Sequence, residues 1–398
     1  MLKRFRVRNF KNLLDVEFRP VGVNLLIGPN NAGKTNLCKA LRFLCGSSFL
    51  TLDQAALWVL GESWNITNVA VGEKVIEIEA DVELVSLSKT YSYSYFLRLS
   101  AEHEQSTLKQ SLKVLDEKLV IGGENFPQID LIENHRGTAL LTNERAFLNP
   151  GSNGSPVTES QVPPESTALS KVFDTQASRL AVLFKEFLYN SLYFNLEPSA
   201  LRNPKITAET NLPSPVGGNF SKALFTVHNR MPDLEKKVIK ALRLLEPGLE
   251  KFEFPSADPD FIQFFLEDKS GHKFSVQSMS DGTLRYLALS FITVILAGVA
   301  PLPNLPRLII FEEPENGLYV GLLKPLFEQM DFSGRNGQCI FTTHSPYVID
   351  LFDAHLEAVH LMKPGTPGSV LTKPDANLVK KLLDDMPLGE IHYREMLG

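Results

Sequence analysis

The segment GPNNAGKT at residues 28–35 constrains this chain more than any other feature of its sequence. It fits the pattern G-x-x-x-x-G-K-[ST]. It also lies between an apolar run at 21–28 and a stretch in which Leu37, Leu41 and Leu44 recur at helical spacing. A glycine-rich turn between a strand and a helix directs backbone N–H groups and the helix N-terminus at an anion. We therefore expect the chain to bind a nucleoside triphosphate.

The residues of this loop have separate expected tasks. Lys34 would neutralise the β- and γ-phosphates, and the hydroxyl of Thr35 would ligate Mg²⁺. Asn31 can adopt the positive φ that a β-branched residue resists. The predicted nucleotide-binding residues of the loop are Gly28, Pro29, Asn30, Asn31, Ala32, Gly33, Lys34, Thr35 and Asn36.

Composition and charge exclude several classes of protein. With 398 residues and 43% hydrophobic content, the chain can bury a sizeable core. A net charge of −6 gives no global attraction to DNA or to an anionic membrane, so that any contact with nucleic acid must be a local patch. The three cysteines lack metal-type spacing and fit a reducing cytoplasm. Residues 1–12 lack the apolar core of a signal peptide, and the apolar run 286–300 is shorter than the ~20 residues that span a bilayer. We expect a cytoplasmic protein with no membrane partner.

Periodicity divides the rest of the chain. Two-residue alternation at 75–123 predicts an antiparallel meander, and the Gly, Ser and Pro of 149–166 predict a mobile loop. Apolar residues at helical spacing in 169–188 predict an amphipathic helix that packs either on the core or on a second subunit or partner. Another helix is expected at about 233–245. We expect an N-terminal lobe at 1–99 and a C-terminal lobe at 226–398. The segment 100–225 between them would hold the end of the meander, the loop and a helical insertion.

Three motifs follow the glycine-rich loop in order. SMSDGTLRYLAL occupies 278–289, LIIFEEPENGLYV occupies 308–320, and CIFTTHSPYVI occupies 339–349. Taken alone, glutamates that follow an apolar strand are usually a solvated strand end. After a phosphate loop, however, carboxylates and a histidine are the groups that hold a metal and place a base for phosphoryl transfer. Glu312, Glu313 and His344 are therefore candidate site residues.

These motifs resemble those of the ABC-type ATPases that act on DNA rather than in transport, and most of all the ATPase modules of OLD-type and RecF-like proteins. The resemblance rests on RNFKN at 8–12, GPNNAGKTN at 28–36, SDGTLR at 280–285, IIFEEPENGL at 309–318 and TTHSP at 342–346. It implies an α/β fold, a P-loop NTPase of the ABC head type with an antiparallel β-meander subdomain and a largely helical insertion. It also implies Lys11 as a nucleotide-binding residue, and ATP and Mg²⁺ as cofactors.

The resemblance further implies a two-headed site. In such ATPases two heads enclose two nucleotides, and the phosphate loop of one head faces the signature motif of the other. Ser280 and Gly282 would accordingly contact the γ-phosphate bound to a partner chain, as suits a helix N-terminus. Glu315 belongs with Asn316, Gly317 and Leu318 to the segment expected to contact the other subunit, and a solvated polar residue is the alternative left open for it.

The remaining roles fall on the strand ends. Glu312 would hold Mg²⁺ together with Thr35, Glu313 would be the general base for the attacking water, and His344 would contact the γ-phosphate. Lys34, Glu313 and His344 are thus the predicted catalytic residues.

Three departures from the family pattern limit what can be carried over. Gln54 is the only glutamine between the phosphate loop and the meander, and it does not lie in a convincing glutamine motif. Tyr319 and Val320 stand where this subgroup usually has His-Pro. The signature SMSDGT lacks the paired glycines of transporters, which disfavours a transporter energy subunit.

Two functions stay open on this reading. The residues after His344 are too few for a nuclease domain of about 100 residues. We therefore expect a homodimeric or larger ATPase that controls a separately encoded, nuclease-like effector in bacterial anti-phage defence or DNA repair. The alternative is a RecF-like, ATP-gated clamp that binds DNA, for which the motivating basic positions are Lys3, Arg4, Arg6, Arg8 and Lys11.

Overall fold

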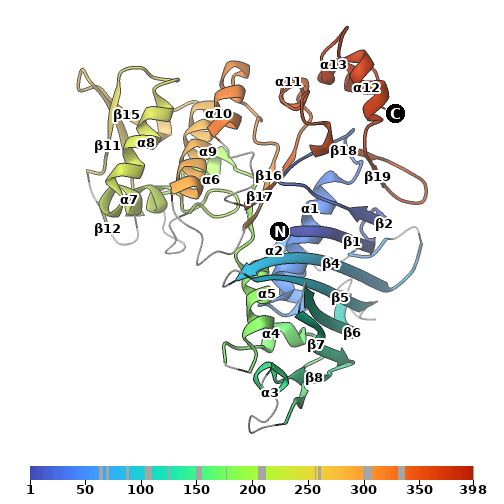
Figure 1. Cartoon of the computed structure of the whole chain (residues 1–398). Helices are drawn as coiled ribbons and strands as arrows, with labels where there is room; N and C mark the ends of the chain where they lie inside the picture. Colours follow the sequence, from blue (N-terminus) through green and yellow to red (C-terminus); the bar gives the residue numbers. More distant parts are fainter. Residues whose placement is uncertain are drawn as a thin grey trace. The chain divides into compact units, whose positions relative to one another are not determined.

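The computed structural model describes the chain except residues 62–65, 69–70, 87–88, 104–109, 124–125, 149–154, 176, 205–211, 256, 259–260, 299–306, 330–336 and 398 (Figure 1). The chain forms two compact units. Unit 1 comprises Met1–Ser191, Asn304–Leu308 and Glu357–Lys373. Unit 2 comprises Leu192–Pro303, Ile309–Leu356 and Pro374–Gly398. These units differ from the predicted lobes at 1–99 and 226–398 and the predicted segment 100–225 between them. Those predicted bounds stay a prediction.

Unit 1 contains an eight-stranded antiparallel sheet in the order β2-β1-β4-β5-β6-β7-β8-β9 (Figure 1). From β4 to β9 each strand pairs with the next along the chain, as predicted for a meander. The strands are β1 Leu2–Phe10, β2 Leu13–Phe18, β4 Val75–Ser86, β5 Lys89–His103, β6 Gln110–Gly123, β7 Phe126–His135, β8 Thr138–Thr142 and β9 Val157–Gln161.

The meander extends further than predicted. Pairing continues past residue 123 through β9, which lies inside the predicted mobile loop at 149–166. Residues 149–154 of that loop lie outside the described residues. The rest of it contains a strand because Val157 and Thr158 supply the β-branched side chains that a strand favours, and their backbone groups pair with β8.

Alternation gives this sheet one apolar face. Ile76, Ile78 and Ala80 of β4 are fully buried, whereas the residues between them carry charges. On the apolar side, the rings of Tyr93 and Tyr95 each lie 5.4 Å from the ring of Phe184 in helix α5 (Arg179–Tyr189). The core of unit 1 therefore lies between this helix and the sheet.

The amphipathic segment at 169–188 is not one continuous helix. Its two helical parts are α4 (Ala168–Lys171) and α5, and Phe173 between them is 73% exposed. The break is stabilised by polar groups that compete with helical bonding, since Oγ of Ser178 donates to the carbonyl of Phe173 at 2.6 Å. Lys185 also donates to the carbonyls of Ser170 and Val172, both at 2.8 Å. The buried residues of α5 pack within unit 1, as the core alternative predicted.

A second group of strands in unit 1 carries the glycine-rich loop. β3 (Val23–Ile27) pairs in parallel with β18 (Val359–Lys363), which pairs with the antiparallel β19 (Val370–Thr372). All five residues of β3 are buried, as expected for a central parallel strand. The loop after β3 leads into α1 (Lys34–Ser47), and α2 (Leu52–Leu60) packs on α1. Helix α3 (Glu144–Leu148) follows the end of β8.

Unit 2 carries the other three motifs. Strands β10 (Leu192–Phe194), β16 (Arg307–Glu312, in this unit from Ile309) and β17 (Gly337–Thr342) are neighbours, with β10 parallel to β16. The helices are α6 Pro198–Leu201, α7 Phe220–Arg230, α8 Pro232–Leu242, α9 Asp281–Gly298, α10 Leu323–Gln329, α11 Pro346–Asp350, α12 Ala376–Leu382 and α13 Leu388–Tyr393. The small strands are β11 Leu249–Glu253, β12 Ala257–Asp258, β13 Phe261–Ile262, β14 Phe265–Asp268 and β15 Lys273–Ser275. Single 3₁₀ turns occupy Val276–Ser278, Val320–Leu322 and Leu356–Ala358.

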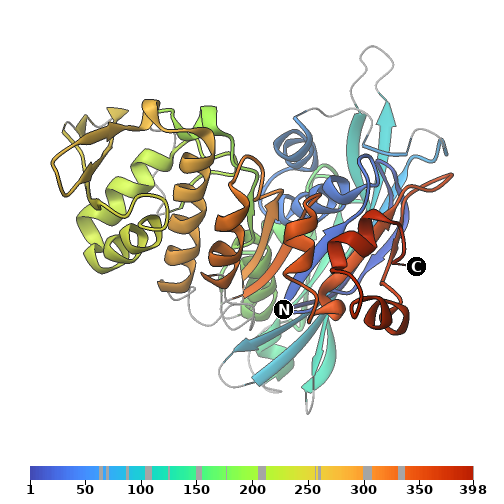
Figure 2. The same cartoon turned by 90° about the horizontal axis from the view of Figure 1, so that it is seen from above.

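Helix α9 is the central helix of unit 2. It packs against α8, and the ring of Phe291 lies 5.5 Å from that of Phe220 in α7, a helix that the sequence did not predict (Figures 1 and 2). By length and composition alone its 18 residues could cross a bilayer, but 61% of them are buried in the protein. Burial of this kind is what a core helix requires.

Candidate functional site

The glycine-rich loop has the backbone conformation that its sequence predicts. Gly28 has φ 144°, Gly33 has φ 105°, and Asn31 has φ 63°, all in the region that L side chains rarely adopt. A Cβ on Gly28 would lie 2.0 Å from the carbonyl oxygen of Met362 in β18. Only glycine fits there. The loop therefore leaves its inner surface to backbone N–H groups, as a phosphate cradle requires.

Lys34 begins α1 and is buried, with 5% of its surface exposed. Its Nζ donates to the carbonyl oxygen of Gly28 at 2.8 Å and to that of Pro29 at 3.1 Å. The ammonium group therefore lies over the loop, where it would neutralise phosphate charge. Thr35 is exposed beside it, and the first turn of α1 contains no acidic residue that would oppose an anion.

Asn12 supports the loop from outside, and sequence reasoning gave it no role. Its Nδ2 donates to the carbonyl of Asn31 at 3.1 Å, and its Oδ1 accepts from Nδ2 of Asn36 at 2.7 Å. Its carbonyl accepts from the backbone N–H of Ser369 at 2.9 Å. The motif RNFKN contains Asn12, but the sequence predicted a nucleotide-binding role only for Lys11, which lies in the same turn and has φ 52°. The short polar side chain of Asn12, next to the basic Lys11, was the feature of the sequence that could have indicated this supporting role.

In unit 2, Glu312 ends β16 and is buried, with 6% of its surface exposed. Its Oε2 accepts from the hydroxyl of Tyr193 at 2.6 Å and from Nδ2 of Asn195 at 3.4 Å. Both partners come from β10 and the residue that follows it. A buried carboxylate needs such partners, because burial otherwise disfavours its charge.

Glu313 points to a different group from Glu312. Its φ of 42° is left-handed, and its backbone N–H donates to the carbonyl of Thr342 at 3.1 Å. This conformation is uncommon for a residue other than glycine and is found often at functional sites. Oε1 of its carboxylate lies 3.5 Å from Nε2 of His344, and both side chains are about one third exposed, at 35% and 36%. The structure thus brings the predicted base and the predicted switch histidine together.

Glu315 is placed otherwise than expected. We expected it to face another subunit, but it is buried, with 9% of its surface exposed. It accepts from the hydroxyl of Thr343 and, at 3.3 Å, from the backbone N–H of His344. Burial raises the pKa of its carboxyl group, and the hydrogen bond from Thr343 opposes that shift. Glu315 therefore fixes the backbone that carries His344.

The signature residues lie at the exposed start of α9. Oγ of Ser280 accepts from the N–H of Thr283 at 3.1 Å, and Asp281 pairs with Arg202 at 2.7 Å. Gly282 lies against the turn that follows β16, since a Cβ there would be 2.3 Å from the carbonyl oxygen of Gly317. Unit 2 therefore holds the signature and the glutamate turn in direct contact.

A comparison of this chain with protein families gives one match. The family described as "AAA domain, putative AbiEii toxin, Type IV TA system" matches residues 23–350. The chain belongs to this family. It is an ABC-type ATPase head of the SMC and RecF kind, as the resemblance implied, and the predicted fold class is confirmed.

Two known proteins illustrate the similarity. A segment of 65 residues is 42% identical to the DNA replication and repair protein RecF of Magnetococcus marinus, and covers 16% of this chain and 17% of that protein. The chain thus matches about a sixth of this curated relative. The crystal structure of an SMC head bound to the C-winged helix domain of ScpA is similar over 96% of this chain and 99% of that chain, with TM-score 0.53 and 11% identity. That likeness shows the shared fold.

The residues of this ATPase family member fit its cofactors by their chemistry. Gly28 and Gly33 have positive φ values, and a glycine-rich turn of this conformation before a helix directs backbone N–H groups at an anion. The exposed hydroxyl of Thr35 and the carboxylate of Glu312 are hard oxygen donors, which suit Mg²⁺. Thr35 belongs to unit 1 and Glu312 to unit 2, so that their joint ligation of a metal stays a prediction. Among the described residues, no group of three or more His, Cys, Asp or Glu is placed to hold a metal on its own.

Four of the five basic positions that motivated a DNA clamp, Lys3, Arg4, Arg6 and Arg8, are engaged with carboxylates. Arg4 pairs with Glu17 at 2.8 Å and Glu79 at 2.5 Å, and Arg6 pairs with Asp15 at 2.8 Å. Further pairs of this face are Lys3 with Glu83, Arg4 with Asp81, Arg8 with Asp15 and Glu77, and Arg98 with Glu77 and Asp116. The hydrogen bond from Arg6 lowers the pKa of Asp15. This face of the sheet is a ladder of ion pairs and offers little net charge to phosphates.

Gln54 lies outside the nucleotide motifs. Gln54 forms a capping box with Thr51 at the start of α2.

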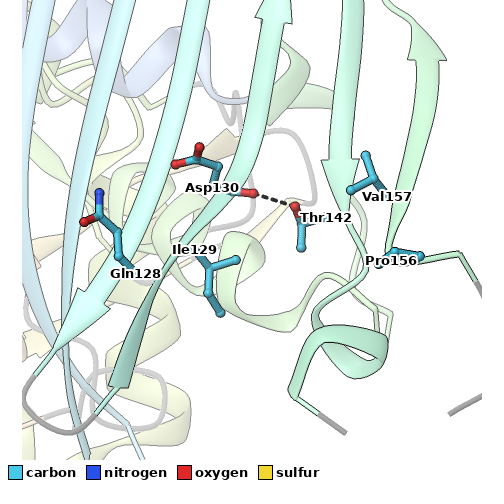
Figure 3. A pocket seen from close by; sticks show the side chains of 6 residues that line it. All are labelled: Gln128, Ile129, Asp130, Thr142, Pro156 and Val157. Carbon is cyan, nitrogen blue, oxygen red and sulfur yellow. Dashed lines mark hydrogen bonds between the residues drawn. The ribbon is translucent and has the colours of Figure 1, made fainter. Parts of the chain in front are cut away.

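A groove of about 560 Å³ lies between the ends of β7, β8 and β9, and is lined by Gln128, Ile129, Asp130, Thr142, Pro156 and Val157 (Figure 3). None of the predicted site residues lines it. A much smaller cavity, of about 10 Å³, is lined by Glu312, Glu313 and Arg285 among others. That volume is about the room needed for a single water molecule.

Proposed function

We propose that this protein binds ATP with Mg²⁺ and hydrolyses it, and that two copies assemble around the nucleotides. The observation that carries the proposal is the pairing of Glu313 with His344 at 3.5 Å, at the end of the strand that buries Glu312. A carboxylate beside a histidine, next to a second carboxylate, is suited to placing a water molecule and a metal for phosphoryl transfer. The family match and the positive φ values of Gly28 and Gly33 in the glycine-rich loop support the same assignment.

Each residue has a task in this mechanism. The N–H groups of the loop and the ammonium group of Lys34 bind and orient the phosphates. Thr35 and Glu312 would hold Mg²⁺, which when bound neutralises phosphate charge. Glu313 accepts a proton from the attacking water, and its exposed carboxylate can reach solvent. His344 adds a donor near the transferred phosphoryl group, where charge develops.

Dimerisation is supported by the exposure of the signature. Ser280 is exposed at the start of α9 and Gly282 is partly so, and the helix N-terminus there favours an anion. We propose that these residues contact the nucleotide of a second copy, so that one chain alone has an incomplete site. A higher oligomer built from such dimers fits the same surface.

The hydrolytic assignment is tested with Glu313→Gln. The variant should bind ATP with Mg²⁺ as tightly as the wild type, should lose at least about 100-fold in kcat, and should form a longer-lived dimer with ATP. The matched control is Glu250→Gln, an exposed glutamate on β11, which should keep wild-type activity. Undiminished hydrolysis by Glu313→Gln would contradict the assignment. A wild-type protein that does not bind ATP would contradict the proposal as a whole.

We propose further that the ATPase controls a separately encoded effector, such as a nuclease, in cytoplasmic anti-phage defence or DNA repair. The family description names a toxin of a type IV toxin–antitoxin system, and the RecF relative is named for DNA repair. The test is co-expression of the chain with its genomic neighbours, using Glu313→Gln to hold the ATP state. A neighbour that copurifies with ATP and not with ADP would support the proposal. A chain that protects cells from phage or DNA damage without any neighbour would oppose it.

A RecF-like DNA clamp is the second candidate, because of the 42% identity to RecF over 65 residues. The ion-pair ladder weakens its original motivation, since Arg4 and Arg6 are neutralised. ATP-dependent and salt-dependent binding of duplex DNA would favour the clamp. No binding at low salt would remove it.

A further inference from the structure

The carboxylate of Glu313 is held from two sides within unit 2. Nδ2 of Asn316 donates to its Oε2 at 2.5 Å, while Nε2 of His344 lies 3.5 Å from its Oε1. Asn316 has no role in the hydrolysis proposed for Glu313 and His344. Asn316 itself is exposed, so that its hydrogen bond to the carboxylate is not a consequence of burial.

Asn316 is fixed in turn by its backbone. Its N–H donates to the carbonyl of Glu313 at 3.1 Å, which closes the turn after β16. Its carbonyl accepts from Nη1 of Arg285, which lies in the first turns of α9. Arg285 also lines the small cavity beside Glu312 and Glu313. The amide of Asn316 is therefore positioned by the signature helix as well as by its own turn.

The start of α9 and this turn are in close backbone contact. A Cβ on Gly282 would lie 2.3 Å from the carbonyl oxygen of Gly317, so the backbones of the two segments touch. A displacement of the start of α9 must move Gly317 and the neighbouring Asn316 with it. Any ligand that acts on the signature would thereby act on the orientation of the Glu313 carboxylate.

We propose that Asn316 is a positioning residue for Glu313, and that Arg285 makes this positioning depend on the start of α9. The inference rests on the proposed function, because it assumes that Glu313 is the base. A carboxylate has about four acceptor sites, and the amide of Asn316 occupies one on Oε2. Oε1 is left to face His344 and the attacking water. Without the amide, the long side chain of Glu313 is free to rotate away from that orientation.

The test compares Asn316→Ala with the wild type in steady-state ATP hydrolysis. The variant should lose about tenfold in kcat with KM changed less than about twofold, because a positioning residue acts on the chemical step. Asn229→Ala is the matched control, since Asn229 is an exposed asparagine whose amide bonds only the backbone carbonyl of Phe225 in its own helix. It should keep wild-type values. Thermal melting of each variant checks that the fold is intact.

A double-mutant cycle separates positioning from a general structural effect. In a Glu313→Gln background, measured by single-turnover hydrolysis, Asn316→Ala should cost less than about twofold, because the group that it positions is already lost. Arg285→Ala should lower kcat, and its effect should not add to that of Asn316→Ala. Equal losses with and without Glu313, fully additive losses with Arg285, or a kcat within twofold of wild type would each overturn the inference.

The failure of this inference differs from the failure of the proposed function. If Glu313→Gln abolishes hydrolysis while Asn316→Ala leaves it unchanged, only the positioning role is wrong. If Glu313→Gln hydrolyses ATP at the wild-type rate, the base assignment is wrong and the positioning role is wrong with it.

Discussion

Asn36 donates a hydrogen bond from its side-chain amide to Oδ1 of Asn12 at 2.7 Å, and this bond ties the first turn of α1 to the turn between β1 and β2. Because Asn12 also donates to the carbonyl of Asn31, one side chain supports the glycine-rich loop at two places. The loop is thus held by its own glycines from within and by Asn12 from outside.

Removal of this support should weaken nucleotide binding. Asn12→Ala loses two hydrogen bonds to the loop, each worth about 0.5–1.5 kcal/mol, and should raise the Kd for ATP about five- to tenfold. Titration with a fluorescent ATP analogue in the presence of Mg²⁺ measures the change, with Asn229→Ala as control. An unchanged Kd would show that the glycines alone set the loop.

Gly28 and Gly61 both have a positive φ, but they lie in different surroundings and should respond differently to substitution by alanine. In Gly28→Ala the new Cβ meets the carbonyl of Met362, so we expect a loss of several kcal/mol in the free energy of unfolding and no measurable ATP binding. In Gly61→Ala, where φ is 72° and no atom of the described residues lies within 4 Å of the new Cβ, we expect a cost of only about 1 kcal/mol and normal binding. Urea denaturation and nucleotide titration give both values. Similar results for both variants would contradict the close approach of β18.

Glu144 should make the stability of unit 1 fall with rising pH. It is buried and accepts from the N–H groups of Leu180 and Ala181 at 2.7 and 2.9 Å, and burial raises its pKa to about 7. The folded state therefore binds the proton more tightly than the unfolded state. The contribution to stability is fully present below about pH 4.5 and is lost as pH rises to about 7. Between those pH values the wild type should lose roughly 1–3 kcal/mol more than Glu144→Gln in urea denaturation. Parallel pH profiles for the two proteins would contradict this.

His360 should have the opposite effect. Burial, reinforced by the nearby charge of Lys373, lowers its pKa to about 3, so the folded protein keeps the neutral ring. The unfolded chain binds a proton near pH 6.5. The contribution to stability is therefore fully present above about pH 6.5 and is lost as pH falls toward 3. Between pH 7 and pH 5 the wild type should lose roughly 2 kcal/mol more than His360→Gln. If the wild type instead lost less stability than His360→Gln over this pH range, the imidazole ring of His360 would have to be charged in the folded state.

The sequence was sufficient for features that depend on neighbouring residues. The conformation of Gly28, Asn31 and Gly33 and the start of α1 at Lys34 follow from a short pattern, because loop and helix are local structures. The meander was visible as alternation for the same reason. The roles of Glu313 and His344 were predicted from the order of the motifs, but their contact at 3.5 Å was not.

Features that depend on distant residues were missed. The acid partners of Arg4 and Arg6 lie on neighbouring strands, so the sequence alone left these arginines looking available. Asn12 gained its role through Asn31 and Asn36, and Glu315 through Thr343. In each case the local pattern was compatible with a solvated polar residue. Only the fold brought the partner within hydrogen-bonding distance.

The close fit of Gly28 against Met362 also has a consequence for synthesis of the chain. β18 pairs in parallel with β3, although more than three hundred residues separate them in the sequence. A nascent chain that has left the ribosome only as far as α1 has no strand to lie against this side of β3. The loop completes its surroundings only when residues 359–363 emerge. Competence to bind nucleotide is therefore acquired only after β18 has been synthesised, and products truncated before residue 359 should lack it.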